Sequence, residues 1–329
     1  MAHVILHIGA HKTATSFVQR QMFFNRAALR RHGVYYPDLG PNPAHHILAT
    51  PWISLPEIGS EYYGPSGPDG LWETLAQTYA HKPGTLFLSA EVFSRARPQA
   101  VDFGDLRARL AGFDSVKVLY VLRRQPELLQ SIWLQVLKSG TPPPFDRFLS
   151  HALQTHLASG LWLDHTRVYE AVGQGVPAGD ILLWDYDQIR HHPGGILQAV
   201  LDLLQVSMSA REFPPLPDTQ ANHSPDPLAS YAAYAISSPD HPGEALMRRA
   251  HQALIHLPQG RPTLYTRAEY QAVQETFAPL NAALVQRHGP YQPSNQYHLD
   301  LTPPEDLLWR DQIGNMFWLD LLNQMQKAG

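Results

Sequence analysis

The sequence predicts an α/β protein, with a mostly parallel sheet flanked by helices and a helical C-terminal extension. Up to about residue 212, short apolar runs alternate with segments whose apolar residues have helical spacing. The run at residues 116–122 (VKVLYVL) is apolar on both faces, which is typical of a central parallel strand. No strand-like run follows Phe213. Residues 1–212 are therefore expected to form the core, and residues 213–329 a helical extension packed on it within one globular unit.

The individual elements follow from the same patterns. Alternating, β-branched residues predict the first strand at residues 3–8, and a helix follows to about Arg31, ended by Gly33. The other strands are expected at 34–36, 84–89, 116–122 and 180–184. Further helices are expected at 71–79, 103–110, 126–138, 145–157, 161–172 and 195–204. Residues 37–70, dense in proline and glycine, predict an irregular surface segment with one short helix near residues 46–50.

The composition excludes several kinds of chemistry. The chain of 329 residues is 44% hydrophobic, which is enough to bury a sizeable core. It contains no cysteine, so disulfides, cysteine-ligated zinc, iron–sulfur clusters and thiol nucleophiles are excluded. It contains 29 prolines, which are densest at residues 37–68 and 214–227, and we expect the second stretch to join the core to the extension.

The charges are unevenly distributed along the chain. A net charge of −4 argues against a nucleic-acid partner. Residues 1–140 carry 14 Lys and Arg against 10 Asp and Glu, whereas residues 141–329 carry 11 against 19. We therefore expect an anionic ligand to bind the N-terminal part.

The sequence also bears on location. The apolar stretch near the N-terminus is too short, and too interrupted by His and Gly, for the apolar region of a signal peptide. No apolar run approaches the ~18 residues needed to cross a membrane. The expectation is a cytoplasmic protein without a membrane span.

The loop at residues 9–16 (GAHKTATS) follows the first strand and opens a helix. Ligands of open α/β sheets bind beyond the carboxyl ends of the strands, and the free N–H groups of a helix N-terminus favour an anion there. Lys12 adds a positive charge to the loop. It is not a Walker A loop, because no glycine precedes Lys12. The simpler interpretation is a helix capped by Ser or Thr that happens to carry a lysine.

A second anion-binding pattern lies later in the chain. Arg123 ends the strand predicted at 116–122, and Ser131 follows eight residues later on the next helix. A guanidinium at a strand end and a hydroxyl two turns into the adjacent helix can both reach one phosphate.

Together the two patterns resemble the sulfotransferase family, which transfers a sulfuryl group from 3′-phosphoadenosine 5′-phosphosulfate (PAPS). The family's loop K-[ST]-G-T-[ST] is matched by residues 12–16 (KTATS), with Ala14 in place of glycine. The family's strand ending in Arg, with Ser on the following helix, is matched by Arg123 and Ser131. Residues 181–189 (ILLWDYDQI) resemble a third family segment. The resemblance covers about residues 3–205 and implies a P-loop-like sulfotransferase fold of bacterial type.

The resemblance also implies a ligand and a set of residues. PAPS would be the sulfuryl donor, adenosine 3′,5′-bisphosphate the product, and no metal would be required. The loop residues implied around the 5′-phosphosulfate are His11, Lys12, Thr13, Ala14, Thr15 and Ser16. Arg123 and Ser131 are implied at the 3′-phosphate, and Trp184 and Tyr186 are possible neighbours of the adenine. Lys12 is implied to be catalytic as well, because charge develops on the departing phosphate oxygen.

Three residues are candidates for the general base that the acceptor requires. Glu91 lies just past the strand predicted at 84–89, whereas His45 and His46 lie in the irregular 37–70 segment. The alternatives are a carboxylate at a helix N-terminus for Glu91 and a solvated loop for the two histidines. The choice of base stays open.

The acceptor would be a hydroxyl or amine of a small molecule or carbohydrate. Aromatic residues such as Trp52, Trp72, Tyr265, Tyr270 and Trp309 suit a sugar or phenol, although aromatic residues also fill cores. Two other functions stay open: a P-loop-type kinase or phosphotransferase, and a catalytically idle nucleotide-binding module. The sequence predicts no metal site, and it makes no prediction of oligomeric state.

Overall fold

The computed structural model describes residues 1–216, 225–254, 260–292 and 299–326. The chain divides into two compact units. The first unit comprises Met1–Arg123, Gly160–Thr219 and Leu280–Leu299, and the second comprises Arg124–Ser159, Gln220–Pro279 and Asp300–Gly329.

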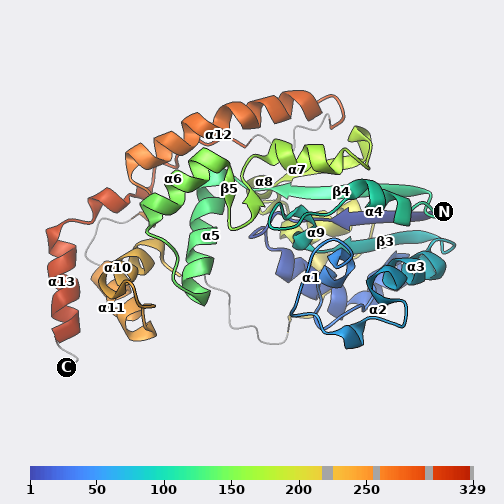
Figure 1. Cartoon of the computed structure of the whole chain (residues 1–329), viewed down its shortest axis with the longest axis horizontal. Helices are drawn as coiled ribbons and strands as arrows, with labels where there is room; N and C mark the ends of the chain where they lie inside the picture. Colours follow the sequence, from blue (N-terminus) through green and yellow to red (C-terminus); the bar gives the residue numbers. More distant parts are fainter. Residues whose placement is uncertain (217–224, 255–259, 293–298, 327–329) are drawn as a thin grey trace. The chain divides into compact units, whose positions relative to one another are not determined.

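The first unit is built on a five-stranded parallel sheet (Figure 1). The strand order is β2-β3-β1-β4-β7. The strands are β1 (Ala2–His7), β2 (Val34–Tyr35), β3 (Gly84–Ser89), β4 (Ser115–Leu122) and β7 (Ile181–Asp185). Every pairing in this sheet is parallel. The predicted fold class, a mostly parallel sheet flanked by helices, is confirmed.

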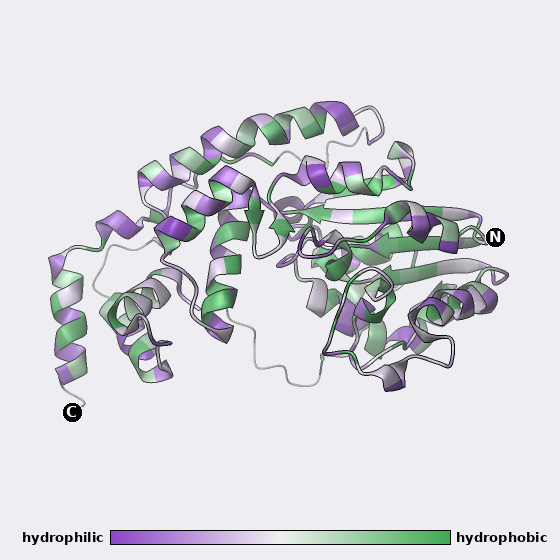
Figure 2. Ribbon diagram, viewed as in Figure 1, coloured by the Kyte–Doolittle hydropathy of each residue, from purple (hydrophilic) through white to green (hydrophobic). Residues whose placement is uncertain are grey.

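Helices cover both faces of this sheet. On one face lie α1 (Thr15–Phe24), α2 (Arg26–Arg31) and α9 (Gly195–Leu203), packed against strand residues such as Ile5 and Phe87. On the other lie α3 (Gly67–Tyr79), α4 (Phe103–Arg109) and α7 (His165–Val172), packed against Val4 and Leu6. Figure 2 shows the strands as the apolar centre of this unit. Burial of both faces explains why the strand at 116–122 is apolar throughout.

Short elements complete the first unit. They are α8 (Tyr186–Ile189), β6 (Leu161–Trp162) and the 3₁₀ helices η1 (His46–Ala49), η2 (Ser60–Tyr62), η3 (Glu91–Ser94), η4 (Ala178–Asp180) and η5 (Ala210–Glu212). The short helix expected near residues 46–50 is thus the 3₁₀ helix η1.

Two predicted helices differ from the structure for local reasons. The first helix is divided into α1 and α2 at Asn25, whose Nδ2 donates to the Gln21 carbonyl at 2.8 Å. The helix predicted at 161–172 begins only at His165. Its N-cap is Asp164, whose carboxylate accepts from the Thr166 N–H at 3.0 Å. Side chains that bond the local backbone compete with a continuous helix at both places.

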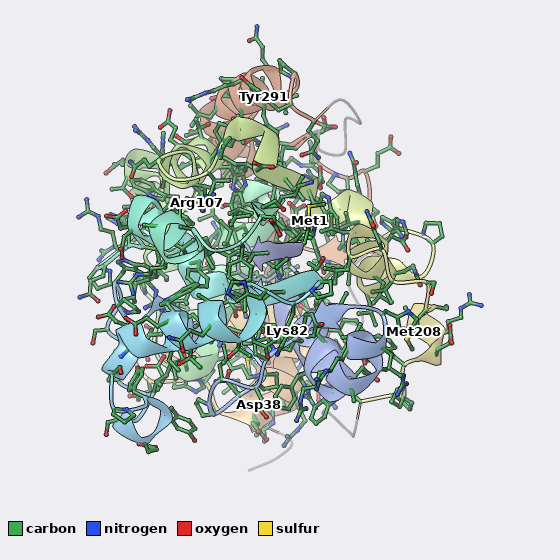
Figure 3. The ribbon with its side chains drawn as sticks, turned by 90° about the vertical axis from the view of Figure 1, so that its right-hand side faces the viewer. Met1, Asp38, Lys82, Arg107, Met208 and Tyr291 are labelled. Atoms are coloured by element: carbon green, nitrogen blue, oxygen red, sulfur yellow. The ribbon has the colours of Figure 1, made fainter. Side chains whose placement is uncertain are left out.

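The two edges of the sheet have different surroundings. Met1 and Lys82 lie just before β1 and β3, and Figure 3 shows them at the amino-terminal edge. The Gly84 N–H donates to the Met1 carbonyl at 3.1 Å at this edge. The anion loop predicted from the sequence follows His7 and therefore lies at the opposite, carboxyl edge.

The second unit is mainly helical. Its helices are α5 (Gln125–Ser139), α6 (Phe145–Thr155), α10 (Pro227–Ser237), α11 (Glu244–Leu254), α13 (Asn315–Gln326), the 3₁₀ helix η6 (Arg310–Gln312) and the first part of α12 (Arg267–His288). It also contains β5 (Leu157–Ala158) and a parallel pair formed by β8 (Arg261–Pro262) and β9 (Leu307–Leu308). The prediction of no strand after Phe213 is wrong for this pair, because a strand of two residues is too short to show a periodic pattern.

The units do not divide at residues 212 and 213. Residues 124–159 group with the C-terminal helices, whereas residues 280–299 group with the sheet. The Gln292 side chain accounts for the second grouping: its Nε2 donates to the Leu183 carbonyl at 2.6 Å, and its Oε1 accepts from the Leu183 N–H at 2.8 Å. The Gln292 side chain thus bonds the N–H and the carbonyl of Leu183 at the outer edge of β7, as a further strand would. In the expected joint at 214–227, residues 217–224 lie outside the described residues.

Candidate functional site

Residues 9–16, named the anion loop from here on, are tied to β4. The Ala10 N–H donates to the Val121 carbonyl at 2.8 Å, and the Val121 N–H donates to the Gly9 carbonyl at 2.6 Å. The pairing of β1 with β4 thus continues into the loop. This anchoring holds the loop at the carboxyl edge of the sheet.

The loop contains three residues with positive φ, namely Gly9 (+85°), Lys12 (+66°) and Ala14 (+58°). The Thr13 hydroxyl donates to the Ala10 carbonyl at 2.7 Å and closes the turn. Ala14 is the N-cap of α1, so the position where the family has glycine requires the left-handed conformation here. This conformation costs an L-residue roughly 1–2 kcal/mol. The loop is therefore strained where the first N–H groups of α1 lack partners within the helix.

The anion loop lies where the strand order reverses. The connection after β1 leads to β2 on one side of the sheet, and the connection after β4 leads to β7 on the other. A crevice forms at such a point outside the carboxyl ends of the two strands, and open α/β sheets bind ligands there. The loop follows one of these strands and Arg123 follows the other.

Arg123 is fixed from several directions. Its Nη1 donates to the Lys12 carbonyl at 2.5 Å, and its guanidinium lies 5.6 Å from the centre of the Tyr186 ring. Its own carbonyl is 2.9 Å from Nε2 of His165, whose Nδ1 is 2.9 Å from the Tyr120 hydroxyl. Burial lowers the pKa of His165, so the neutral ring donates to the carbonyl and accepts from the tyrosine. Two cationic residues are thus held at the switch point.

Ser131 and Arg124 belong to the second unit. Ser131 lies on α5 and is half-buried, and its pairing with Arg123 stays a prediction. Arg124 donates through Nη2 to the Tyr270 hydroxyl at 2.9 Å and to the Thr302 carbonyl at 2.8 Å. Those contacts give Arg124 a structural role within its unit.

Glu91 lies directly against the anion loop. A Cβ added to Gly9 would lie 2.9 Å from the Glu91 Cβ, so only glycine permits this approach. The Glu91 carboxylate accepts from Nε2 of Gln19, a buried residue of α1, at 2.9 Å. The same Gln19 nitrogen is 3.2 Å from the Ser89 hydroxyl. Sequence reasoning missed Gln19, although a polar residue on the inner face of the helix that follows an anion loop is a usable signal.

Several histidines surround Glu91. Nε2 of His46 is 3.9 Å from a Glu91 oxygen, and the Ser89 hydroxyl is 2.9 Å from Nδ1 of His7. Nε2 of His7, Nε2 of His11 and Nδ1 of His46 are buried without a hydrogen-bond partner among the described residues. The structure therefore places Glu91, His46 and the anion loop close together, and His7 lies beside them.

The electrostatic environment keeps Glu91 charged. Burial alone would raise its pKa, but His46, His11 and the Gln19 hydrogen bond together lower it below the ordinary value. Burial lowers the pKa of His7 and of His11 to about 4, although the Glu91 charge opposes the effect. At neutral pH the site thus contains a carboxylate flanked by two neutral imidazoles.

His45, one of the candidate bases, bonds backbone groups through both of its ring nitrogens. The ring is fully buried, its Nδ1 accepts from the Ser89 N–H at 3.0 Å, and its Nε2 donates to the Pro37 carbonyl at 2.8 Å. Both nitrogens are occupied, so neither can take a proton from a ligand. The residue ties the irregular 37–70 segment to β3.

Most of the aromatic residues considered for the acceptor or for the adenine fill cores. Trp72 and Trp184 are buried in the two cores of the first unit. Tyr265, Tyr270 and Trp309 stack edge to face in the second unit, with ring centres 5.5 Å apart in each step. Edge-to-face contacts of this kind are usual in protein cores.

A cavity of about 400 Å³ lies beside α1 in the first unit. Its lining includes Phe17 and Tyr186, the glycines 194 and 195, and the side chains of Arg190 and Arg211. Phe17 is 42% exposed, and the Tyr186 ring contacts Arg123 as described above. Sequence reasoning missed Phe17, an apolar residue in the first turn of α1 that is not needed for the core.

The described residues contain neither a metal-binding cluster nor a membrane-spanning helix. Among the described residues, no group of three or more His, Asp and Glu side chains is arranged to hold a metal ion. Likewise, no described helix combines the length and the apolar character needed to cross a membrane.

These features define an α/β protein whose parallel sheet has a strained, lysine-containing loop at its switch point. No family model matches the chain, and no curated protein matches it. The chain is similar to two solved structures of sulfotransferases. One is from Alicyclobacillus acidocaldarius, with 14% identity, a TM-score of 0.38, and coverage of 70% of this chain and 92% of the other. The other is mouse sulfotransferase SULT7A1 complexed with PAP, with 13% identity, a TM-score of 0.43, and coverage of 89% of each chain.

Proposed function

We propose that this protein is a sulfotransferase that moves the sulfuryl group of PAPS to a hydroxyl or amine. The observation that carries the proposal is the joint placement of Lys12 and Arg123 at the switch point, with Glu91 against the same loop. Two cations with a charged carboxylate beside them suit the transfer of an anionic group to an acceptor that must lose a proton.

The residues present fit the donor. Gly9 leaves room for the close approach of the loop to Glu91, and the Nε2 atom of His11 is buried without a described partner. Lys12, Thr15 and Ser16 would hold the 5′-phosphosulfate together with the N–H groups that open α1. Arg123 would hold the 3′-phosphate. The bound donor would supply the sulfuryl group.

The cavity beside α1 supports a nucleoside ligand. Phe17 and Tyr186 offer aromatic surface on which a purine can stack, and Arg123 is adjacent to Tyr186. A volume of about 400 Å³ lies within the usual range for small-molecule pockets. The adenosine of the donor would therefore lie between Phe17 and Tyr186.

Glu91 is the proposed general base. It is charged, it lies against the loop, and Gln19 fixes the direction of its carboxylate. In this proposal Glu91 accepts the proton of the acceptor group as the acceptor oxygen or nitrogen bonds to sulfur. Lys12 stabilises the charge that develops on the phosphate oxygen when its bond to sulfur breaks. His46, whose side chain is partly exposed, passes the proton from Glu91 towards solvent.

Transfer of ³⁵S from labelled PAPS to a panel of sugars, phenols and amines tests the proposal. The wild-type protein is expected to label at least one class, and Lys12→Ala should abolish labelling while unfolding at nearly the same denaturant concentration. Arg147→Glu, at an exposed arginine of α6, serves as the control. Equal labelling by the wild type and Lys12→Ala would show that the assignment of Lys12 to the active site is wrong. A strict requirement for Mg²⁺–ATP in phosphoryl transfer would favour the kinase alternative.

A further inference from the structure

A second cavity, of about 540 Å³, lies within the helical unit between α5, α10 and α11. Its walls are largely apolar. Leu134 and Leu137 line it from α5, and Met247 lines it from α11. Both leucines are less than 8% exposed, so the cavity reaches below the protein surface. Its volume and its apolar walls are those of a small-molecule site.

The cavity is held open by contacts on its borders. Trp133 of α5 packs edge to face on Tyr234 of α10, with ring centres 5.3 Å apart. The His241 ring donates through Nε2 to the Leu137 carbonyl at 2.6 Å. Helices α10 and α11 meet through small side chains, including Ala232, Ala233, Ala250 and Ala253, together with the buried Phe317 and Leu321 of α13. These contacts fix the helices on the borders of the cavity.

The rim of the cavity carries positive charge. Lys138 and Arg248 line it, and both are exposed. Glu244 also lines it and lies 3.7 Å from Arg248, but the two side chains are 93% and 70% exposed, which makes their pairing weak. No ion pair joins Lys138 to any described residue. The rim therefore carries one more cationic than anionic side chain, and it borders apolar walls.

We propose that this cavity binds an amphiphilic anion, a hydrocarbon chain that ends in a carboxylate or sulfate. The chain would lie along Leu134, Leu137 and Met247, and the anionic end would pair with Lys138 at the rim. The occupant is a single free amphiphile rather than a lipid surface, since the apolar walls are recessed below the rim. This proposal is independent of the proposed sulfuryl transfer, so a negative result for amphiphile binding would leave the proposed function unaffected.

Titration calorimetry with octanoate, decanoate and dodecanoate, each below its micelle concentration, tests the site. Each buried methylene should tighten binding about fourfold until the cavity is full. Decanol and decyltrimethylammonium should bind at least about tenfold more weakly than decanoate, because neither pairs with Lys138. Affinity that does not depend on chain length, or equal affinity for the cationic amphiphile, would overturn the proposal.

Two variants locate the binding. Met247→Trp fills the cavity from a half-buried position and should weaken decanoate binding at least tenfold, and Lys138→Glu should abolish the preference for decanoate over decanol. Arg147→Glu removes an exposed positive charge outside the cavity and should leave binding unchanged. If circular dichroism shows that Met247→Trp does not fold, the selectivity of Lys138→Glu alone tests the proposal. The proposal would be contradicted if Lys138→Glu still preferred decanoate over decanol. It would also be contradicted if the protein sedimented with phosphatidylglycerol vesicles but did not bind decanoate.

Discussion

At the scale of single residues, the anion loop combines strain with charge. Ala14 stands where the family motif has glycine, and the sequence alone does not show whether this exchange is costly. The structure answers the question, because Ala14 has a φ of +58° and caps α1 without a side-chain hydrogen bond. The residue therefore stores strain at the point where the loop turns into the helix.

Replacement of this residue gives a first prediction. Ala14→Gly should raise the free energy of unfolding by about 0.5–1 kcal/mol, since relief of the left-handed strain exceeds the added freedom of the unfolded chain. Urea unfolding measures the change. Ala10→Gly is the matched control: Ala10 has a negative φ and a buried side chain, so this change should destabilise the protein. A loss of stability in Ala14→Gly would mean that the loop does not adopt this conformation.

Gln19 gives a second prediction. Gln19→Leu removes the hydrogen bond to the charged form of Glu91, so the pKa of Glu91 should rise from its lowered value. Carboxyl ¹³C chemical shifts measured against pH report the titration directly. Gln21→Leu, on the same helix, is a control that should leave this titration unchanged. If Glu91 titrates identically in Gln19→Leu and wild type, Gln19 does not orient the carboxylate.

At the scale of elements, buried histidines join neighbouring segments. His7 ends β1 and contacts Ser89 at the end of β3, and His45 ties the irregular segment to the same residue. The sequence predicts these strands well because their apolar alternation is strong. It does not predict that the histidines act as links, since a histidine in a loop and one in a core have the same local pattern.

These links give a third prediction, the loss of stability in acid. Burial lowers the pKa of His7 and of His45 to about 4, below the unfolded value of 6.5. The unfolded chain therefore binds more protons between pH 6.5 and 4, and stability falls as the pH decreases through that window. For each histidine, the loss between pH 7 and pH 5 should be on the order of 2 kcal/mol. Urea unfolding at a series of pH values measures it.

A pair of variants isolates the effect. His45→Gln should make the pH dependence of the unfolding free energy shallower, because it removes one of the buried histidines whose pKa is lowered. His81→Gln, at an exposed position, should leave the pH dependence as it is in the wild type. Stability that stays constant from pH 7 to pH 5 would show that the buried rings are not held neutral.

At the scale of the whole molecule, the sequence predicts the sheet better than the division into units. A parallel sheet follows from buried strands alternating with helices, and strand order places the anion loop and Arg123 at one switch point. The grouping of residues 124–159 with the C-terminal helices follows instead from tertiary packing, such as that of Trp133 on Tyr234. An amphipathic helix shows which of its faces is buried but not what covers that face.

The same limit applies to the candidate site. Lys12, Arg123 and Glu91 can be found from the sequence because each follows a strand. Gln19 and Phe17 are harder to find because they lie within a helix and follow no strand, and the role of His7 depends on its contact with Ser89 across the sheet. His45 and His46 are adjacent in the sequence, yet only the structure shows that one is occupied by backbone groups and the other faces Glu91.

The most direct test of the account is calorimetric titration of the protein with adenosine 3′,5′-bisphosphate in the presence of EDTA. We expect binding without metal and a loss of about 2–4 kcal/mol of binding free energy in Arg123→Ala, where a charge pair is removed. Lys12→Ala should also weaken binding, and Arg147→Glu should not. No binding by the wild-type protein without Mg²⁺, or equal affinity in Arg123→Ala, would contradict the proposed donor site.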